Sequence, residues 1–395
     1  MIASPSSSTA ATLAADAVFM DRALELAARG VALASPNPLV GAILVRDGRV
    51  VGEGFHTYEG LRHAEIIALE TARESARGAT LYINLEPCCH TGRTGPCTQA
   101  LMAAGIARVV AAMADPNPAV AGRGFEQLRA AGIEVSSGLR EAEARRLNEA
   151  FARWIVSRKP LVTLKSALTL DGQLVLPPAK RRARARARTS QKDRWISSPE
   201  SRAEVQRMRH ASDALLTGIG TVLIDDPLLT DRTGLPRRRK LLRVVLDSRL
   251  RLSLRSKLVR SADQDVLVFT RAKENSPKAR ALRRAGVEIV RLPGRAAQPN
   301  LVEAAAELGR REILSVLLEA GATLNSAALA AGIVDKMRVF FAPKVAGPPG
   351  TGKRPATPSA PARHHAVQDL QNVTIEPFGP DFAIEGYLRD VYRTR

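Results

Sequence analysis

The chain has 395 residues, 45% of them hydrophobic and 25% charged, so it is long enough for two domains and has the composition of a soluble globular protein. Three cysteines exclude a disulfide-rich scaffold and favour the reducing cytoplasm. The net charge of +20 would suit nucleic acid, but six of these charges lie in 180–188 and four in 237–240, and neither run contains aromatic residues that stack on bases. No apolar run reaches the roughly 18 residues of a membrane span. We therefore expect a cytoplasmic protein with no nucleic-acid or membrane partner.

Residues 1–16 lack the basic and apolar segments of a signal peptide, and we predict a disordered leader there. Helical and strand patterns then alternate along the chain. Helices are predicted at 20–29, 63–76, after Cys97 and at 141–157, and strands at 42–45, 50–54, 80–85 and 108–113. Asp47-Gly48 predicts a hairpin turn between the first two strands. This order indicates a first α/β domain over residues 17–158, which ends before Pro160.

A second pattern of strands occupies residues 159–395. Strands are predicted at 161–167, 214–217, 241–246, 265–270 and 313–319. Their near-continuous apolar runs suit a parallel sheet that is buried on both faces. Two low-complexity segments, 180–188 and 347–365, are predicted to be flexible insertions, and we expect the first to be dispensable. GPPGTGK at 347–353 has the spacing of a phosphate-binding loop, but Arg354 replaces the required Ser or Thr, so we predict a surface loop.

All three cysteines lie in the stretch NLEPCCHTGRTGPC, residues 84–97. His63-Ala64-Glu65 lies upstream, at the predicted start of a helix. A histidine and a glutamate two residues apart, followed by Pro-Cys and a further cysteine, are typical of zinc-dependent nucleobase deaminases. One imidazole and two thiolates leave one zinc position open for water, as catalytic zinc requires. Glu65 would take a proton from that water and give it to the leaving amine.

Two alternatives remain for the cysteines. Cys88 and Cys97 could form a disulfide, which suits a reducing compartment poorly. Cys89 could instead complete a structural zinc site, but adjacent cysteines chelate one ion awkwardly and Glu65 would then have no task. The catalytic zinc site accounts for more of the motif.

The cysteine spacing departs from the general Pro-Cys-x-x-Cys pattern, because eight residues separate Cys88 from Cys97. Together with PNPLVGA (36–42), GFHTYEGLRHAE (54–65) and DPNPAVAGRG (115–124), it resembles the deaminase half of the bifunctional deaminase/reductase of riboflavin biosynthesis. The resemblance implies a cytidine-deaminase-like three-layer α/β fold. It implies that the zinc ligands are His63, Cys88 and Cys97, that Glu65 is catalytic, and that the substrate is bound by Asn37, His56 and His90. Cys89 replaces a small polar residue of the family and is left out of the ligand set.

The second half of the chain is similar to the reductase domain of the same family. The similarity is carried by LKSALTLDGQ (164–173), DRWISSPESR (193–202), LLTGIGTVLIDDP (215–227), VVLDS (244–248) and LLEAGATLNSAAL (317–329). It implies a dihydrofolate-reductase-like α/β fold that uses NADPH. The residues implied to bind NADPH are Ala167, Trp195, Thr221, Asp225, Ser248, Gly321, Ala322, Thr323, Leu324, Asn325, Ser326 and Ala327. Those implied to bind the substrate are Arg209, Leu229, Arg232 and Glu319.

The resemblance therefore implies two sequential reactions on small phosphoribosyl-pyrimidines. The first is zinc-dependent hydrolytic deamination of 2,5-diamino-6-(5-phosphoribosylamino)pyrimidin-4(3H)-one. The second is NADPH-dependent reduction of the ribosyl to the ribityl chain of 5-amino-6-(5-phosphoribosylamino)uracil. We also expect a homo-oligomer. The alternatives are a nucleoside or tRNA deaminase fused to an unrelated reductase-like domain, and a nucleic-acid-binding protein with a degenerate deaminase fold.

Overall fold

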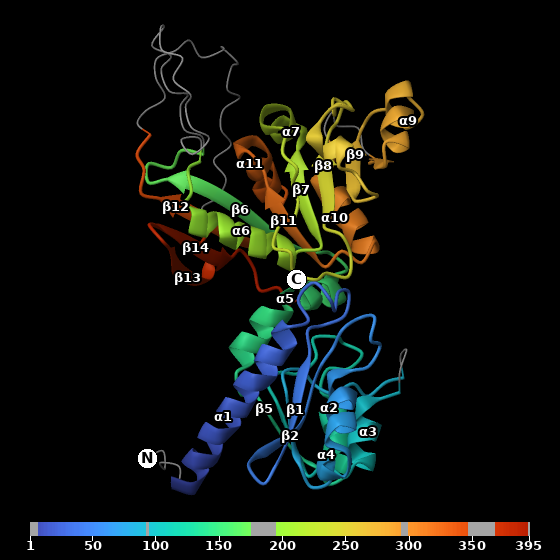
Figure 1. Cartoon of the computed structure of the whole chain (residues 1–395), viewed down its shortest axis with the longest axis vertical. Helices are drawn as coiled ribbons and strands as arrows, with labels where there is room; N and C mark the ends of the chain where they lie inside the picture. The colour runs from blue at the N-terminus through green and yellow to red at the C-terminus, as the bar shows by residue number, and fades with distance from the viewer. Residues whose placement is uncertain (1–6, 92–94, 175–194, 294–298, 347–367, 394–395) are drawn as a thin grey trace. The chain divides into compact units, whose positions relative to one another are not determined.

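The computed structural model describes residues 7–91, 95–174, 195–293, 299–346 and 368–393 (Figure 1). The chain forms two compact units. The first contains Met1–Lys159, Leu235–Arg239 and Val391–Arg395, and the second contains Pro160–Gly234 and Lys240–Asp390. The predicted insertions at 180–188 and 347–365, and the GPPGTGK segment, lie outside the described residues. Among the described residues, no helix combines the length and apolar character needed to cross a bilayer.

The first unit is a five-stranded sheet of order β2-β1-β3-β4-β5. Its strands are β1 (Gly41–Arg46), β2 (Arg49–Phe55), β3 (Thr80–Ile83), β4 (Arg108–Ala111) and β5 (Glu134–Ser137). Its helices are α1 (Ser7–Ala28), α2 (Ala64–Ala72), the 3₁₀ helix η1 (Arg73–Ala76), α3 (Cys97–Ala103), α4 (Arg123–Ala130) and α5 (Glu141–Ser157). Strand β1 is antiparallel to β2 and β3, whereas β3, β4 and β5 are parallel.

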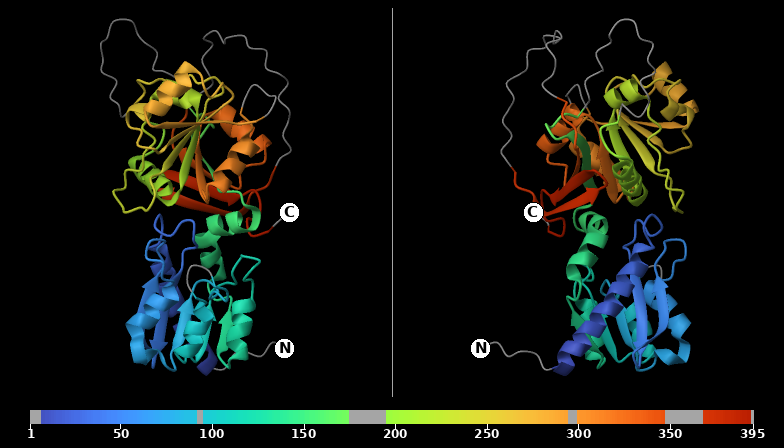
Figure 2. Two further views of the ribbon diagram at one scale, coloured as in Figure 1. Left: turned by 90° about the vertical axis from the view of Figure 1, so that its right-hand side faces the viewer. Right: turned by 60° about the vertical axis from the view of Figure 1, so that its left-hand side comes forward.

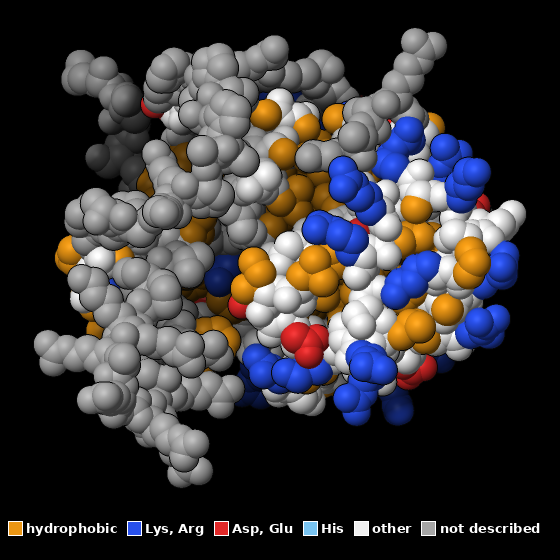
Figure 3. Space-filling model, turned by 90° about the horizontal axis from the view of Figure 1, so that it is seen from above, with side chains coloured by type: hydrophobic (Ala, Val, Ile, Leu, Met, Phe, Trp, Pro, Cys, Tyr) orange, Lys and Arg blue, Asp and Glu red, His pale blue; other side chains and the backbone are white. Residues whose placement is uncertain are grey.

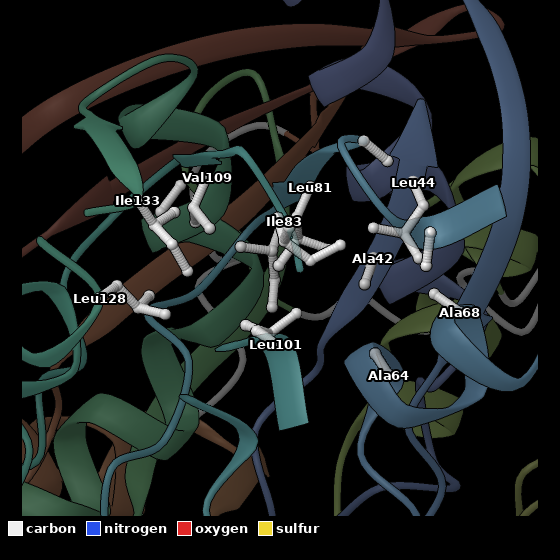
Figure 4. Packing of buried hydrophobic residues seen from close by; sticks show 14 of the residues in the cluster. Ala42, Leu44, Ala64, Ala68, Leu81, Ile83, Leu101, Val109, Leu128 and Ile133 are labelled. Carbon is white, nitrogen blue, oxygen red and sulfur yellow. The ribbon is translucent and has the colours of Figure 1, made fainter. Parts of the chain in front are cut away.

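Alternate residues of β1 face opposite helical layers, because successive side chains of a strand point to opposite faces. Ala42 and Leu44 pack in a core with α2, α3 and α4, part of which Figure 4 shows. Ile43 and Val45 pack in a second core with residues of α1 and α5. The sheet therefore lies between two helical layers, and the expected three-layer α/β fold is confirmed.

The predicted disordered leader is wrong for residues 7–16, because α1 begins at Ser7. The buried carboxylate of Asp16 explains the order at this end of the helix. It accepts a hydrogen bond from the Tyr82 hydroxyl (2.5 Å) and two from the Arg108 guanidinium (2.8 and 3.0 Å). These partners lie on β3 and β4, so they tie α1 to the sheet.

The second unit is a nine-stranded sheet of order β10-β9-β8-β7-β11-β6-β12-β14-β13. Its strands are β6 (Leu161–Thr169), β7 (Ala214–Gly218), β8 (Leu242–Leu246), β9 (Val266–Thr270), β10 (Val287–Arg291), β11 (Ser315–Glu319), β12 (Lys336–Ala342), β13 (Gln371–Phe378) and β14 (Asp381–Tyr387). Its helices are α6 (Pro199–Ala211), α7 (Ile219–Asp225), α8 (Lys257–Arg260), α9 (Pro277–Arg284), α10 (Leu301–Arg310) and α11 (Ala322–Ala330).

The strands from β10 to β12 are parallel, and β14 and β13 add an antiparallel edge. Helices cover both faces of the parallel part (Figure 2), with residues of α10 and α11 in one core and residues of α7, α8 and α9 in another. The predicted parallel sheet buried on both faces is confirmed for these strands.

Positive charge is concentrated in the second half of the sequence. Residues 160–395 contain 42 of the 59 Lys and Arg but only 23 of the 39 Asp and Glu. Figure 3 shows Lys and Arg side chains spread over the exposed face of the second unit that it displays. The first 159 residues are close to neutral.

Candidate active sites

The start of α2 presents two polar side chains of the predicted metal site. His63 is the residue that caps this helix, and Glu65 lies in its first turn. The helix can approach β2 closely because Gly54 has no side chain: a Cβ there would lie 2.3 Å from the backbone oxygen of Ala64. Glu65 is buried, with only 3% of its surface exposed. The glycine thus brings a histidine and a buried carboxylate to one end of the sheet.

One predicted thiolate ligand, Cys88, lies in the connection between β3 and α3, and the other, Cys97, is the first residue of α3. The Nδ1 atom of His63 lies 3.1 Å from Sγ of Cys97 and 3.5 Å from Sγ of Cys88. The three ligand atoms all lie within 4.8 Å of one another. Donors around one tetrahedral zinc ion are about 3.6–3.8 Å apart, from the usual bond lengths. The cluster therefore fits a zinc ion.

The electrostatics of the cluster favour a thiolate. Hydrogen bonds from the Cys97 thiol and from His63 lower the pKa of Cys88 to about 4, although burial opposes this. The hydrogen bond with Cys88 in turn raises the pKa of His63. Burial raises the pKa of Glu65. A raised pKa makes this carboxyl group easier to protonate, which suits a residue that takes up a proton and passes it on.

Asn37 and His56, two of the predicted substrate-binding residues, are hydrogen-bonded to each other. Nε2 of His56 lies 2.9 Å from the Asn37 amide nitrogen, and its Nδ1 lies 2.9 Å from the Arg62 carbonyl oxygen. Burial lowers the pKa of His56, so the ring is neutral, donating from Nδ1 and accepting at Nε2. Its ring lies edge-on to that of His63, with 5.6 Å between the centroids. His90 is exposed.

Sequence reasoning missed two asparagines that hold the segment containing Asn37. Asn84 is fully buried; it accepts from the Gly41 amide and donates to the Leu39 oxygen. Asn148 of α5 accepts from the Leu39 amide and donates to the Leu39 oxygen. Asn84 could have been identified from the sequence, because it is an asparagine that directly follows the apolar residues of a predicted strand, as YIN at 82–84 shows.

In the second unit, most predicted cofactor residues follow the carboxyl ends of parallel strands. Thr221 follows β7, Ser248 follows β8, and the segment 321–327 follows β11, while Ala167 lies near the end of β6. Strands β8, β7, β11 and β6 are consecutive in the sheet. Ligands of open α/β sheets bind outside the carboxyl ends of the strands, so the structure gathers these residues along one edge.

The turn at Gly321 fits an anionic dinucleotide. Gly321 caps α11, and a Cβ there would meet no atom within 4 Å among the residues with a described position; the same holds at Gly220. In the part of the chain that the structure describes, the buried Oδ1 of Asn325 has no hydrogen-bond partner. A helix N-terminus attracts phosphate, and a bound amide or hydroxyl would satisfy Asn325.

Glu319 and Arg209 form a bidentate pair, with N···O distances of 2.6 and 2.9 Å. Burial opposes ionisation of Glu319, but the Arg209 guanidinium lowers its pKa below the usual value. Strand register places Lys165 of β6 directly beside Glu319 of β11. Burial lowers the pKa of Lys165. Sequence reasoning missed Lys165, although a lysine within the apolar run LVTLKSALTL was a usable signal.

The remaining predicted residues are more dispersed. Leu229 is 5% exposed and packs in the core with α7, so it does not present its side chain to solvent. Arg232 is exposed, and its charge acts on Glu319. Asp225 is exposed at the end of α7. Trp195 is 50% exposed and has the Arg202 guanidinium 5.3 Å from its ring centre.

Two family descriptions match the chain, one for each unit's fold. The RibD C-terminal domain matches residues 160–384, and the cytidine and deoxycytidylate deaminase zinc-binding region matches residues 14–113. The chain is 42% identical to the riboflavin biosynthesis protein RibD of Escherichia coli over 351 residues, which cover 85% of this chain and 90% of that protein. It is 39% identical to the RibD protein of Actinobacillus pleuropneumoniae, over 87% of this chain and 86% of that one.

Solved structures of RibD proteins are also similar to this chain. Acinetobacter baumannii RibD superimposes with a TM-score of 0.76 at 34% identity, covering 95% of this chain and 99% of that one. A deaminase/reductase from Thermotoga maritima gives a TM-score of 0.75 at the same identity and coverage. The chain therefore belongs to the RibD family of bifunctional deaminase/reductase enzymes of riboflavin biosynthesis.

Proposed function

We propose a division of the two RibD reactions between two domains. Residues 17–158 would deaminate 2,5-diamino-6-(5-phosphoribosylamino)pyrimidin-4(3H)-one, and residues 159–395 would reduce the ribosyl chain of the deaminated product with NADPH. The observation that carries the first assignment is the group of three ligand atoms within 4.8 Å of one another beside a buried glutamate. The assignment of the reductase rests on the carboxyl ends of the consecutive strands β8, β7, β11 and β6, which the predicted cofactor residues, including the Gly321 turn, follow or adjoin.

In the deaminase site, His63, Cys88 and Cys97 hold the zinc ion. Bound zinc lowers the pKa of a water ligand to about 7 and so supplies hydroxide at neutral pH. Glu65 takes the proton of the attacking water and passes it to the leaving amino nitrogen. Between these two transfers Glu65 carries the proton, and burial, which raises its pKa, favours this protonated form. Asn37, His56 and His90 orient the pyrimidine, and the neutral His56 ring keeps Asn37 in place.

In the reductase site, the amides of 321–327 and Thr221 bind the phosphates of NADPH, whereas Ala167, Trp195, Asp225 and Ser248 line the rest of its path. Bound NADPH supplies the hydride. Arg232 and Arg209 meet the substrate phosphate and sugar, since arginine donates in a planar fork and stays charged. Glu319 and the adjacent Lys165 accept and donate hydrogen bonds at the ribose, and Leu229 is the apolar residue of the substrate site.

We extend the proposal to the setting of the enzyme. Its partners are small phosphoribosyl-pyrimidines, with no role for nucleic acid, and it acts in the cytoplasm as a homo-oligomer. A reducing compartment keeps the thiols of Cys88 and Cys97 available to zinc. Light scattering of the purified protein measures the mass that decides between a monomer and an oligomer.

The deaminase assignment is tested by Glu65→Gln. This variant keeps its zinc but loses deamination by about 10²–10⁴-fold, because only proton transfer is removed. Zinc content and deaminase kcat are measured together, with Glu70→Gln as control, since Glu70 lies on the same helix and is exposed. Full deaminase activity in Glu65→Gln, or active protein without zinc, would refute the assignment.

A further inference from the structure

Glu86 lies two residues before Cys88, and its buried carboxylate has an unusual set of partners. Only 3% of the residue is exposed. One oxygen accepts from the backbone amides of Gly124 (2.8 Å) and Phe125 (3.4 Å). The other accepts from the amides of Asp115 (3.0 Å) and Gly122 (2.8 Å). One side chain thus collects four amide donors, three from segment 115–124 and one from the next residue, Phe125 of α4.

A second contact joins the same two parts of the chain. A Cβ at Gly124 would lie 2.2 Å from the backbone oxygen of Pro87, so this glycine allows the start of α4 to lie directly against the residue before Cys88. The amide of Glu86 also donates to the Met113 oxygen at 3.0 Å. Residues 86 and 87 therefore hold the segment at its start, through Asp115, and at its end, through Gly122 and Gly124.

Segment 115–124 is also close to Cys88, because Gly124 lies against the backbone oxygen of Pro87, the residue before this cysteine. The segment is organised internally by side-chain oxygens: Asp115 accepts from the Asn117 amide and Asn117 from the Ala119 amide. These hydrogen bonds determine the conformation within the segment, but they do not fix its position relative to Cys88. The hydrogen bonds of Glu86 fix that position.

We propose that Glu86 is a positioning residue that fixes segment 115–124 against the Cys88 turn, as one wall of the deaminase substrate pocket. The proposal rests on the deaminase function proposed above. A wall residue contributes equally to binding the substrate and the transition state, so its loss raises KM and leaves kcat largely unchanged. A merely structural glutamate would instead affect zinc content and stability.

Glu86→Gln tests this assignment with the full-length zinc enzyme. The amide keeps the shape of the side chain, but its NH₂ group faces two amide donors that it cannot accept from. We expect unchanged zinc content, a deaminase KM raised about tenfold and kcat changed less than about threefold. Hydrogen exchange of the 114–126 peptide becomes faster. Glu126→Gln is the matched control, because Glu126 lies on α4, next to the amide donors of Glu86, and its own side chain is exposed.

Glu86→Asp provides the second variant, since it retains both oxygens and the charge but is one methylene shorter. It recovers part of the wild-type KM if Glu86 acts through the four amides. An unchanged KM in Glu86→Gln overturns the proposal, and so does loss of zinc and kcat in both variants. Failure of the deaminase assignment itself is distinguished by Glu65→Gln in the same assay, because active Glu65→Gln refutes that function whatever Glu86 does.

Discussion

Glu319 is a largely buried carboxylate whose charge depends on its neighbours. Burial alone would raise its pKa, whereas the hydrogen bonds and charge of Arg209 lower it, with help from Lys165 and Arg232. Removing one partner of a buried pair leaves the other charge uncompensated, which is the costly half of such an interaction. The pair therefore makes the protonation state of Glu319 sensitive to a single substitution.

Arg209→Gln is expected to move the acidic limb of the reductase pH profile to higher pH. In the wild type the lowered pKa keeps Glu319 ionised into the acidic range; without the guanidinium its pKa rises, and the carboxylate is lost at a higher pH. A neighbouring arginine typically lowers a carboxyl pKa by about one to three, so the limb should move by a similar number of pH units. The measurement is reductase kcat/KM against pH.

Arg207→Gln is the control for this experiment, because Arg207 lies on the same helix, is exposed and pairs with Glu204. A profile for Arg209→Gln that overlays the wild type would show that ionisation of Glu319 has no part in reduction.

At the residue level, the sequence predicted the cluster of His63, Cys88 and Cys97, but it did not predict the buried residues, such as Glu86, that hold neighbouring segments in place. His63, Glu65, Cys88 and Cys97 carry a recognisable spacing, since ligand chemistry restricts which residues can serve. Glu86 carries none, because its partners are backbone amides that any sequence possesses. The pairing of Arg209 with Glu319 joins residues 110 positions apart, and only the fold places them together.

Among the elements, α2 depends on its contact with β2. A Cβ at position 54 would lie 2.3 Å from the Ala64 oxygen and 2.7 Å from the Ile67 Cβ. Neither atom is the end of a flexible side chain, so the helix itself must move. His63 and Glu65 would move with it.

Gly54→Ala is expected to destabilise the first unit by about 1–3 kcal/mol, as overpacking does, and to weaken zinc retention. Denaturant unfolding and zinc content after dialysis measure the two effects. Gly95→Ala is the control, since a Cβ there meets no atom of the described residues within 4 Å. Wild-type zinc affinity and stability in Gly54→Ala would contradict the role given to this close contact.

The sequence predicted elements where the apolar pattern was strong. The hairpin of β1 and β2, helix α5 and the buried strands β7, β8 and β9 were all expected near their observed bounds. Strands β5, with the sequence EVSS, and β13, whose residues are largely exposed, were missed, and so were β10, β12 and β14, in which buried and more exposed residues alternate. Side chains of β5 and β13 carry little hydrophobic signal, and pairing with neighbouring strands makes them extended. The start of helix α1 was predicted too late, because the contacts of Asp16 with Tyr82 and Arg108 leave no pattern in the neighbouring sequence.

For the whole molecule, the two units have separate cores and separate expected ligands. In the proposal made above, zinc binds residues of the first unit, where the His63, Cys88 and Cys97 cluster lies, and NADPH binds residues of the second. A ligand that binds only the folded state stabilises the unit that contains its site, by about 2.7 kcal/mol at a hundredfold excess over Kd.

Calorimetry should therefore resolve two transitions that respond to different ligands. Saturating NADPH is expected to raise the Tm of one transition by about 5–10 °C, whereas a zinc chelator lowers only the other. If both ligands moved a single common transition, the units would unfold cooperatively and the separation proposed here would be wrong.

The most direct test of the whole account is product identification by mass spectrometry for two single-site variants, alone and mixed. Glu65→Gln with the diaminopyrimidine substrate and NADPH should leave the substrate unchanged, yet reduce the deaminated intermediate when that is supplied. Glu319→Gln should accumulate the deaminated intermediate. The mixture should form the ribityl product, because each variant retains the site that the other lacks. Deamination by Glu65→Gln, or loss of deamination in Glu319→Gln, would contradict the assignment of two chemistries to two independent sites.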